Sequence, residues 1–297
     1  MKKAPFVFII FLILVISTAA TKDKYHSKFV ENFNKSTSKN FNLNIRRTGT
    51  DNRYSQGVES PSEKGTKIML FKIDPEDPAG AGRGPEIVSK DFTHFGTYSA
   101  RIKVPNVVNV QPNVGAVVGY FTYHMDSVAG LSEIDFEWLI ADPTIIYVGT
   151  WTGERGNLQR IGRIINLAEG VIYSTSHRIG QGKNELFTDR LQNLPETIQP
   201  IENYDASSQF YTYGFDWYPD RLRWWMLHPT TGETIVLWDY SGSTLGIPQN
   251  QTHYRLNFWH TNNWPVETNR NSIEKPLHNY ELEIDWISYS PYKKSKL

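Results

Sequence analysis

Three acidic residues share one face of a short segment near the middle of the chain. Glu133, Asp135 and Glu137 alternate with bulky apolar residues in SEIDFEWL, residues 132–139. Strict alternation is the period of a β-strand that is buried on one face, so the three carboxylates are expected together on the other face. Like charges on one face destabilise a sheet, so this arrangement calls for an explanation.

One explanation is the cleavage of glycosidic bonds. A retaining glycosidase uses two carboxyl groups about 5–5.5 Å apart, one as nucleophile and one as general acid/base. Residues i and i+4 of a strand have Cα atoms about 13 Å apart, and two glutamate side chains that lean together on a concave sheet close most of that gap. Asp135 between them could hold one partner and help to separate the two pKa values. The alternative is an acidic strand that simply faces solvent.

Short strands are the elements that would position these acids. Strand-like segments recur with turn signals between them, and Pro-Thr-Thr-Gly at residues 229–232 predicts a hairpin. One short helix is expected over residues 184–194, inside a long connecting segment. Repeated short strands predict a β-sandwich. Strands are expected at residues 67–73, 96–104, 115–123, 132–139, 145–152, 210–217, 222–228, 233–239, 254–259 and 282–289.

Composition excludes several classes of function. The formal net charge is +0, which argues against nucleic acid or an anionic membrane as a partner. The absence of cysteine excludes disulfides, thiolate metal sites and a cysteine nucleophile. Aromatic residues make up 13% of the chain, and such rings either stack on sugars or fill a sandwich core.

Residues 1–20 have the pattern of a signal peptide. Lys2 and Lys3 precede an apolar stretch at residues 6–16, and small residues lead to a cleavage point after Ala20. The apolar stretch is too short to span a bilayer comfortably. Residues 21–297 show no repeat or linker and are expected to form a single domain. The mature protein is expected to be secreted, monomeric and free of the membrane after cleavage.

A second group of candidate residues lies in LNFWHTNNW, residues 256–264. Asn257 and Trp259 fall on one face of their strand by the period of two, and Trp264 follows closely. An asparagine that binds hydroxyl groups beside tryptophans that stack on rings is suited to sugar binding. The same tryptophans could equally belong to the core.

SEIDFEWL resembles the active-site signature of glycoside hydrolase family 16, the E-[ILV]-D-x-E strand. GTYSARIKVP, GAVVGYFTY, FYTYGFDWYPDRLRWW and ELEIDWISY are similar, in the same order, to the family's framework strands. The resemblance implies an all-β, concanavalin-like β-jelly-roll sandwich of two antiparallel sheets with a concave substrate cleft. It also implies a retaining, endo-acting reaction on a polysaccharide, with no cofactor required for catalysis.

The resemblance assigns roles to individual residues. Glu133 resembles the nucleophile, Asp135 the assisting carboxylate and Glu137 the general acid/base. Glu86, in GPEIVSK, resembles a substrate-contacting glutamate of the mixed-linkage glucanases, and Trp151 falls where those enzymes carry a tyrosine that binds substrate.

Further residues match the family's cleft and its metal site. Asn257, Trp259 and Trp264 match cleft residues near the central subsites. Asp285, in EIDW, resembles an aspartate that helps to bind a structural calcium ion on the convex side.

Three departures leave the exact glycan open. Leu131 stands where mixed-linkage glucanases usually have tryptophan, Val88 stands where an arginine is expected, and residues 153–208 form a longer segment than in compact bacterial members.

The spacing between Asp135 and Glu137 reduces the number of glycans that fit the resemblance. Members that cut β-1,3-glucan, agar or carrageenan usually have two residues there, which makes a β-bulge. The spacing of one residue in this chain resembles that in lichenases and in the plant and fungal transglycosylases. The plant enzymes usually carry a cysteine-containing extension that this chain lacks. We therefore expect a secreted endo-β-glucanase acting on β-1,3-1,4-glucan. A glucan or xyloglucan transglycosylase and a non-catalytic glycan-binding sandwich are the alternatives.

Overall fold

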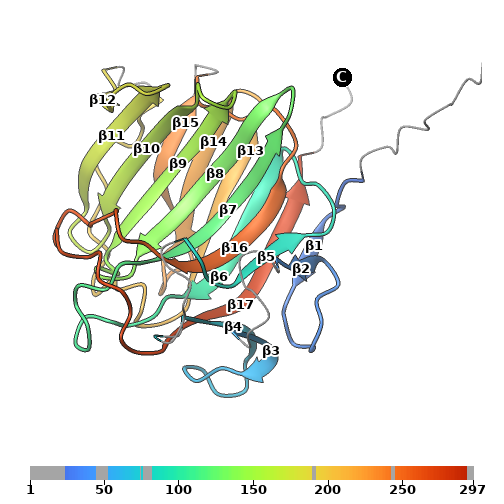
Figure 1. The fold of residues 1–297 in the computed structure, drawn as a ribbon, viewed down its shortest axis with the longest axis vertical. Helices are drawn as coiled ribbons and strands as arrows, with labels where there is room; N and C mark the ends of the chain where they lie inside the picture. Colours follow the sequence, from blue (N-terminus) through green and yellow to red (C-terminus); the bar gives the residue numbers. More distant parts are fainter. Residues whose placement is uncertain are drawn as a thin grey trace, which may run out of the picture.

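The protein folds into two antiparallel β-sheets packed face to face (Figure 1). The computed structural model describes residues 24–44, 53–73, 75, 82–188, 192–241 and 245–292, so the signal peptide expected over residues 1–20 lies outside it. These ranges contain no α-helix, and hence none long and apolar enough to cross a membrane. The prediction of an all-β sandwich is confirmed.

Seventeen strands form in the described residues. They are β1 Phe29–Glu31, β2 Phe41–Leu43, β3 Tyr54–Glu59, β4 Lys67–Ile73, β5 Glu86–Ser89, β6 Gly96–Lys103, β7 Ala116–Asp126, β8 Gly130–Leu139, β9 Ile145–Gly153, β10 Gln159–Asn166, β11 Val171–Ile179, β12 Glu185–Leu186, β13 Tyr211–Tyr218, β14 Arg221–Leu227, β15 Thr234–Ser241, β16 His253–His260 and β17 Tyr280–Pro291.

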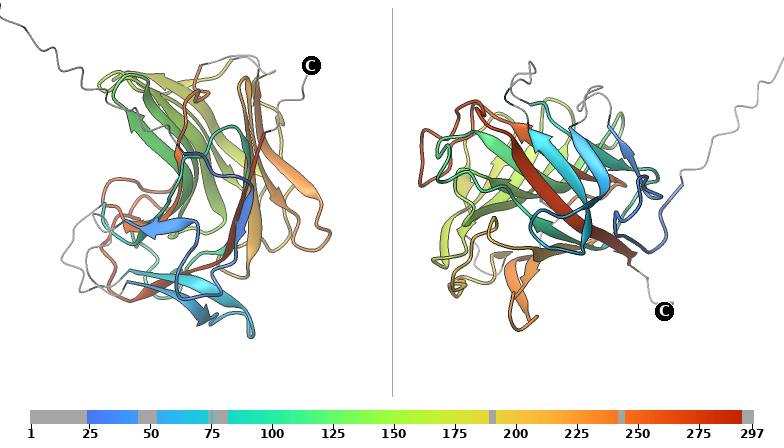
Figure 2. Two further views of the ribbon diagram at one scale, coloured as in Figure 1. Left: turned by 90° about the vertical axis from the view of Figure 1, so that its right-hand side faces the viewer. Right: turned by 90° about the horizontal axis from the view of Figure 1, so that it is seen from below.

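The sheet that carries the acidic strand is called here the front sheet. Its order is β12-β11-β10-β9-β8-β7-β16-β5-β2, so β8 lies near its centre. The back sheet has the order β15-β14-β13-β6-β17-β4-β3, with β1 paired to β17. Figure 2 shows the front sheet bent over the back sheet, with the chain crossing between the two layers several times.

Every strand expected from the sequence forms, and the hairpin at residues 229–232 joins β14 to β15. The long segment after β9 differs from the expectation. It contains β10, β11 and β12, which extend the front sheet beyond β9. The short helix expected over residues 184–194 is wrong, because its described N-terminal part forms β12, which pairs with β11.

The apolar face of β8 anchors the acidic strand to the core. Ile134, Phe136 and Trp138 are all 0% exposed and point between the sheets. Phe136 stacks on Trp138 with ring centroids 4.9 Å apart, and Trp138 meets Tyr213 of the back sheet edge-on at 4.7 Å. Burial of each such side chain contributes about 1.5–3 kcal/mol, more than the roughly 0.2–1 kcal/mol that a like-charge pair on the opposite face costs.

Candidate active site

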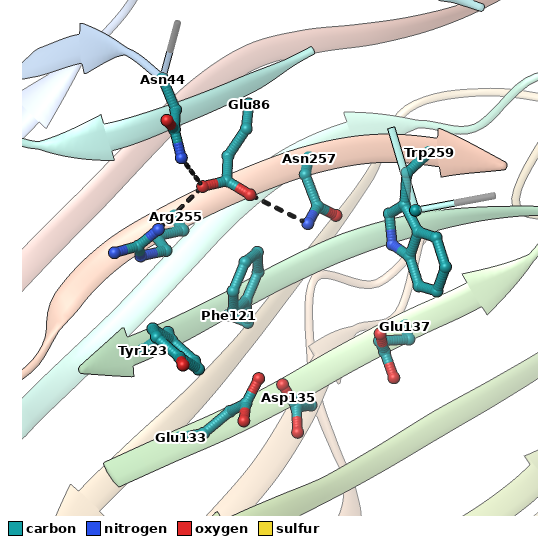
Figure 3. A pocket seen from close by; sticks show the side chains of 11 residues that line it. Asn44, Glu86, Phe121, Tyr123, Glu133, Asp135, Glu137, Arg255, Asn257 and Trp259 are labelled. Carbon is teal, nitrogen blue, oxygen red and sulfur yellow. Dashed lines mark hydrogen bonds and ion pairs between the residues drawn. The ribbon is translucent and has the colours of Figure 1, made fainter. Parts of the chain in front are cut away.

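The three acids lie in one row on the outer face of the front sheet. Figure 3 shows their side chains along β8, with Asp135 between Glu133 and Glu137. The pairing of β8 with β7 and β9 runs without a register shift through all three residues, so the strand has no bulge there. The alternation expected from the sequence is therefore confirmed.

The neighbouring strands place a different surface beside each acid. Glu133 lies between Tyr123 of β7 and Trp151 of β9. Asp135 lies between Phe121 and Gly149, and Glu137 lies between Gly119 and Tyr147. Aromatic groups thus flank the row at both ends, and a glycine adjoins Asp135 on the β9 side and Glu137 on the β7 side.

Burial raises the pKa values of all three acids. It raises the pKa of Glu133 to about 8, with the Glu137 carboxylate adding to the effect and the charge of Arg255 opposing it. Burial also raises the pKa of Glu137 to about 8, against the charge of Arg160. The pKa of Asp135 is raised well above its ordinary value by burial and by both neighbouring glutamates. Acids this close titrate as a group, so the row holds protons near neutral pH.

A cavity of about 390 Å³ lies over the acids. Most of its lining comes from β7, β8, β16 and β5, and it brings together six of the residues predicted from the sequence: Glu86, Glu133, Asp135, Glu137, Asn257 and Trp259. The other lining residues are Asn44, Gly82, Phe121, Tyr123 and Arg255.

Glu86 is the centre of a polar network on one wall of this cavity (Figure 3). It is 1% exposed and accepts hydrogen bonds from Asn44 Nδ2 at 2.6 Å and Arg255 Nη1 at 2.8 Å. Asn257 Nδ2 donates to its other oxygen at 3.3 Å. With both oxygens engaged, Glu86 is better placed to orient Arg255 and Asn257 than to bind substrate itself.

Asn257 presents an acceptor to the cavity. Its Oδ1 is buried and has no hydrogen-bond partner among the described residues. The atom lies over Gly119, where an added Cβ would come within 2.5 Å of it. Gly119 is the register partner of both Asn257 and Glu137, so its lack of a side chain gives the amide room beside the acid.

Tyr147 covers two glycines on the outer face of the front sheet, outside the cavity lining. A Cβ on Gly149 would collide with its hydroxyl, and a Cβ on Gly162 would come within 2.7 Å of its ring. The ring therefore lies flat across the two glycines of β9 and β10. Trp264 packs edge-on against Tyr147 with centroids 5.6 Å apart, which places this predicted residue beside the row of acids but outside the cavity lining.

Trp151 also lies outside the cavity lining, although it is the register partner of Glu133. It is half-buried, and the guanidinium groups of Arg160 and Arg178 approach its ring at 5.7 Å and 4.6 Å. Trp151 thus continues the outer face from Glu133 toward β10 and β11.

Comparison with known proteins agrees with this arrangement. The sequence model described as Glycosyl hydrolases family 16 matches residues 29–288. The chain belongs to glycosyl hydrolase family 16.

Two β-glucanases illustrate the distance of this family-16 chain from characterised relatives. One from Brevibacillus brevis is 23% identical over 218 residues, which are 71% of this chain and 62% of that protein. One from Acetivibrio thermocellus is 25% identical over 207 residues, which are 69% of this chain and 45% of that protein. The match thus spans less than two thirds of the length of either relative.

Solved structures share the family-16 fold. The β-glucanase of Bacillus licheniformis has a TM-score of 0.54 at 17% identity, covering 90% of this chain and 99% of that one. A β-1,3-1,4-glucanase (lichenase) derived from a mouse hindgut metagenome has a TM-score of 0.54 at 20% identity, covering 90% and 100%. Identities this low support the shared fold alone.

The calcium site implied by the family resemblance does not fit the surroundings of Asp285. Its carboxylate pairs with Arg101 at 2.6 Å, and Arg101 also binds Glu63 at 2.7 Å. The guanidinium already supplies the positive charge that a cation would bring, and the described residues contain no group of three or more His, Asp or Glu suited to hold a metal ion. The calcium ion stays a prediction, and Asp285 is a poor choice of ligand for it.

Sequence reasoning missed several residues of this family-16 site. Arg255 precedes Asn257 by two residues, and Phe121 and Tyr123 alternate within GAVVGYFTY, so the period of two could have placed all three on the outer face. Asn44 gave no such signal, because it comes from the distant segment after β2.

Proposed function

We propose that the protein is a retaining endo-β-glucanase that hydrolyses β-1,3-1,4-glucan. The observation that carries this proposal is the row of Glu133, Asp135 and Glu137 on one regular strand under a cavity with aromatic and amide groups in its lining. The β-glucanase relatives support a β-glucan substrate, and the single residue between Asp135 and Glu137 supports its mixed-linkage form.

In the first half-reaction, Glu133 attacks the anomeric carbon while Glu137 protonates the departing glycosidic oxygen. This requires one ionised and one protonated carboxyl group. The raised pKa values and mutual repulsion of the two glutamates favour such a state near neutral pH, because the charge of one acid disfavours ionisation of the other.

In the second half-reaction, Glu137 acts as a base and activates the water that hydrolyses the glycosyl-enzyme. Asp135 lies between the two glutamates, and its raised pKa lets it hold a proton and donate a hydrogen bond to whichever neighbour carries the charge. Asn257 Oδ1 offers an acceptor for a sugar hydroxyl, and Trp259 offers a stacking surface.

The test is reducing-end release from mixed-linkage β-glucan by the purified protein. Glu133→Gln and Glu137→Gln should each lower kcat by at least about a thousandfold, because each removes a group that acts only in the transition state. Glu169→Gln is the matched control, since Glu169 is exposed on the turn after β10. Equal loss in all three variants, or none, would contradict the proposal.

Azide separates the two roles. On an aryl β-glucoside with a good leaving group, azide should restore activity to Glu133→Ala and give the α-glycosyl azide. The same treatment of Glu137→Ala should give the β-glycosyl azide, because the glycosyl-enzyme still forms. Products longer than the substrate, with no net reducing ends, would instead assign the transglycosylase function.

We also propose that the protein acts outside the cell. The pattern of residues 1–20 supports this, and an N-terminal sequence of the exported protein that begins at Thr21 is the expected result.

A further inference from the structure

A row of side chains crosses the front sheet from Glu133 toward β12. Glu133 pairs with Trp151 of β9, Trp151 with Arg160 of β10, and Arg160 with Arg178 of β11. Residues directly opposite each other on antiparallel strands point to the same face. The two arginines therefore share the outer face with the acids, and Figure 1 shows β8, β9, β10 and β11 side by side in this order.

Both guanidinium groups gather around Trp151. The Cζ atom of Arg178 lies 4.6 Å from the centroid of its ring, and the Cζ atom of Arg160 lies 5.7 Å from it. Arg160 lies equally close to Tyr147, at 5.7 Å. These distances are typical of cation–π contacts. Such a contact uses the face of a guanidinium and leaves N–H groups at its edge for a ligand. Here these are the terminal Nη groups, because each Nε is buried.

The arginine pair is unfavourable for the sheet by itself. Arg160 and Arg178 are directly opposite each other, and like charges in that position are destabilising. Among the described residues neither forms an ion pair or a hydrogen bond, and the Nε atom of each is buried without a partner. Arg255 on the same face differs, because Glu86 binds it at 2.8 Å.

The carboxylates of β8 offset the positive charge of Arg160 more than that of Arg178. The charge of Arg160 lowers the pKa of Asp135 and Glu137, so these groups interact across the outer face. Arg178 lies one strand further away and contacts no carboxylate in the described part of the chain. Positive charge therefore remains on the outer face at β11.

We propose that Arg160 and Arg178, with Trp151 as the stacking surface, form a subsite for an anionic substituent on the glycan chain. The inference rests on the proposed function and specifies its substrate as an acidic β-glucan. The substituent is a carboxylate or a sulfate ester, because either presents the paired oxygens that a guanidinium binds in a two-point contact. A neutral glucan offers no charge to match the pair.

The subsite lies away from the bond that is cleaved. Three strand spacings of about 4.8 Å separate the backbones of Glu133 and Arg178, which amounts to about 14 Å. The Arg178 side chain reaches back over Trp151, the neighbour of Glu133, so the acidic sugar would bind beside the reacting centre and not at it. Its charge would act on substrate affinity and the choice of substrate, while the chemical step stays with Glu133 and Glu137.

The experiment measures binding without turnover. The Glu133→Gln protein is titrated calorimetrically with mixed-linkage glucan oligosaccharides of equal length in three forms: neutral, oxidised to the carboxylate at C6, and sulfated at C6. We expect at least one anionic form to bind about tenfold more tightly than the neutral form at low salt. The preference should shrink as salt is added, because exposed charge pairs are screened.

Substitutions of Arg178 test whether this residue causes the preference for the anionic forms. Arg178→Gln in the same background should reduce the ratio of anionic to neutral affinity to about one, and Arg178→Lys should retain part of it. Arg155→Gln is the matched control, since Arg155 is exposed on the turn between β9 and β10, and the ratio should stay unchanged. Thermal unfolding of each variant verifies that it is folded.

The outcomes separate this inference from the proposed function. Equal binding of all three forms, or an equal effect of Arg155→Gln and Arg178→Gln, would overturn the subsite. If the wild-type protein still hydrolyses β-glucan in that case, the proposed function stands. An Arg178-dependent preference without hydrolysis of any of the three forms would support the subsite and overturn the glucanase assignment. Whichever of the carboxylate and sulfate forms binds more tightly identifies the substituent.

Discussion

The indole Nε1 of Trp224 donates a hydrogen bond of 3.0 Å to the backbone oxygen of Asp135. Trp224 belongs to β14 of the back sheet, whereas Asp135 is the middle acid of β8 in the front sheet. Trp224 is buried and stacks on Trp238, with centroids 5.0 Å apart. The back sheet thus fixes the backbone of the acidic strand at the level of its active groups.

Trp224→Phe should remove this contact while keeping most of the buried ring. We expect a loss of about 1 kcal/mol in the free energy of unfolding, as for one buried hydrogen bond, together with a several-fold lower kcat. Trp238→Phe is the matched control, because its indole donates to Gln192 and not to β8. Urea unfolding and steady-state kinetics measure both effects. An equal fall in kcat for the two variants would show that Trp224 has no special role at Asp135.

The pH profile of kcat/KM should be a bell displaced toward neutral pH. In the proposed mechanism activity needs Glu133 ionised, so it should fall as pH drops below the pKa of that group. It also needs Glu137 protonated, so it falls as pH rises above the pKa of Glu137. Burial raises both values, which moves both limbs upward from the ordinary glutamate range. An optimum near pH 4 in a profile of initial rates would contradict these shifts.

Arg160→Gln should move the alkaline limb of that profile further up. The charge of Arg160 lowers the pKa of Glu137, so its removal lets Glu137 keep its proton to higher pH. Arg178→Gln provides the comparison, because Arg178 lies one strand further from the acids. Profiles of the two variants that overlay would show that Arg160 does not act on Glu137.

Stability should depend on pH through the same acids. Burial raises the pKa of Glu137 from its ordinary value of 4.5 to about 8. Between these values the unfolded chain is ionised while the folded protein keeps the proton, so the free energy of unfolding falls as pH rises from about 4.5 to 8 and levels off above. This fall is shared with Glu133 and Asp135, whose pKa values burial also raises.

Glu137→Gln cannot ionise and should escape this loss. Its stability relative to wild type should therefore increase across the same pH window, as measured by urea unfolding at several pH values. Glu169→Gln, on an exposed turn, should show no such trend. A difference between Glu137→Gln and wild type that is constant with pH would disprove the linkage.

Gly119→Ala should displace Asn257. The added methyl group would lie 2.5 Å from Asn257 Oδ1, so the amide must turn away from Glu137. We expect a tenfold or greater fall in kcat/KM. In a double-mutant cycle with Asn257→Ala the two effects should not add, because both act through the same amide. Additive losses would show that Gly119 acts by another route.

The sequence allowed β8 and its two faces to be predicted because the strand obeys a simple rule. Ile134, Phe136 and Trp138 enter the core, and the acids between them face outward. The resemblance to family 16 then supplied the roles. Local pattern could not show that Glu86 is enclosed by Asn44 and Arg255, since these residues meet only when β2, β5 and β16 pair.

The strands β10 and β11 were missed for a physical reason. In β10, Arg163 faces the core and is 1% exposed. Its guanidinium donates hydrogen bonds to the backbone oxygens of Asn193, Pro195 and Leu237. Gly162 and Ile164 lie on the opposite face, so the polarity of the strand is partly reversed. β11 carries polar residues on both faces and shows no alternation of polarity.

The position of the Tyr147 ring beside Glu137 depends on the glycines beneath it. A methyl group on Gly162 would meet only the Tyr147 ring, at 2.7 Å, and would lift it outward. A methyl group on Gly149 would also lie 2.5 Å from the backbone oxygen of Ile161, so it would disturb the strand itself. Under the proposed function, Gly162→Ala would therefore narrow the space beside the acids for branched or bulky glycans. Because Arg160 contacts the same ring at 5.7 Å, this substitution would also disturb the arginine pair. Under the two proposals, the breadth of the substrate and its charge are therefore linked through Tyr147.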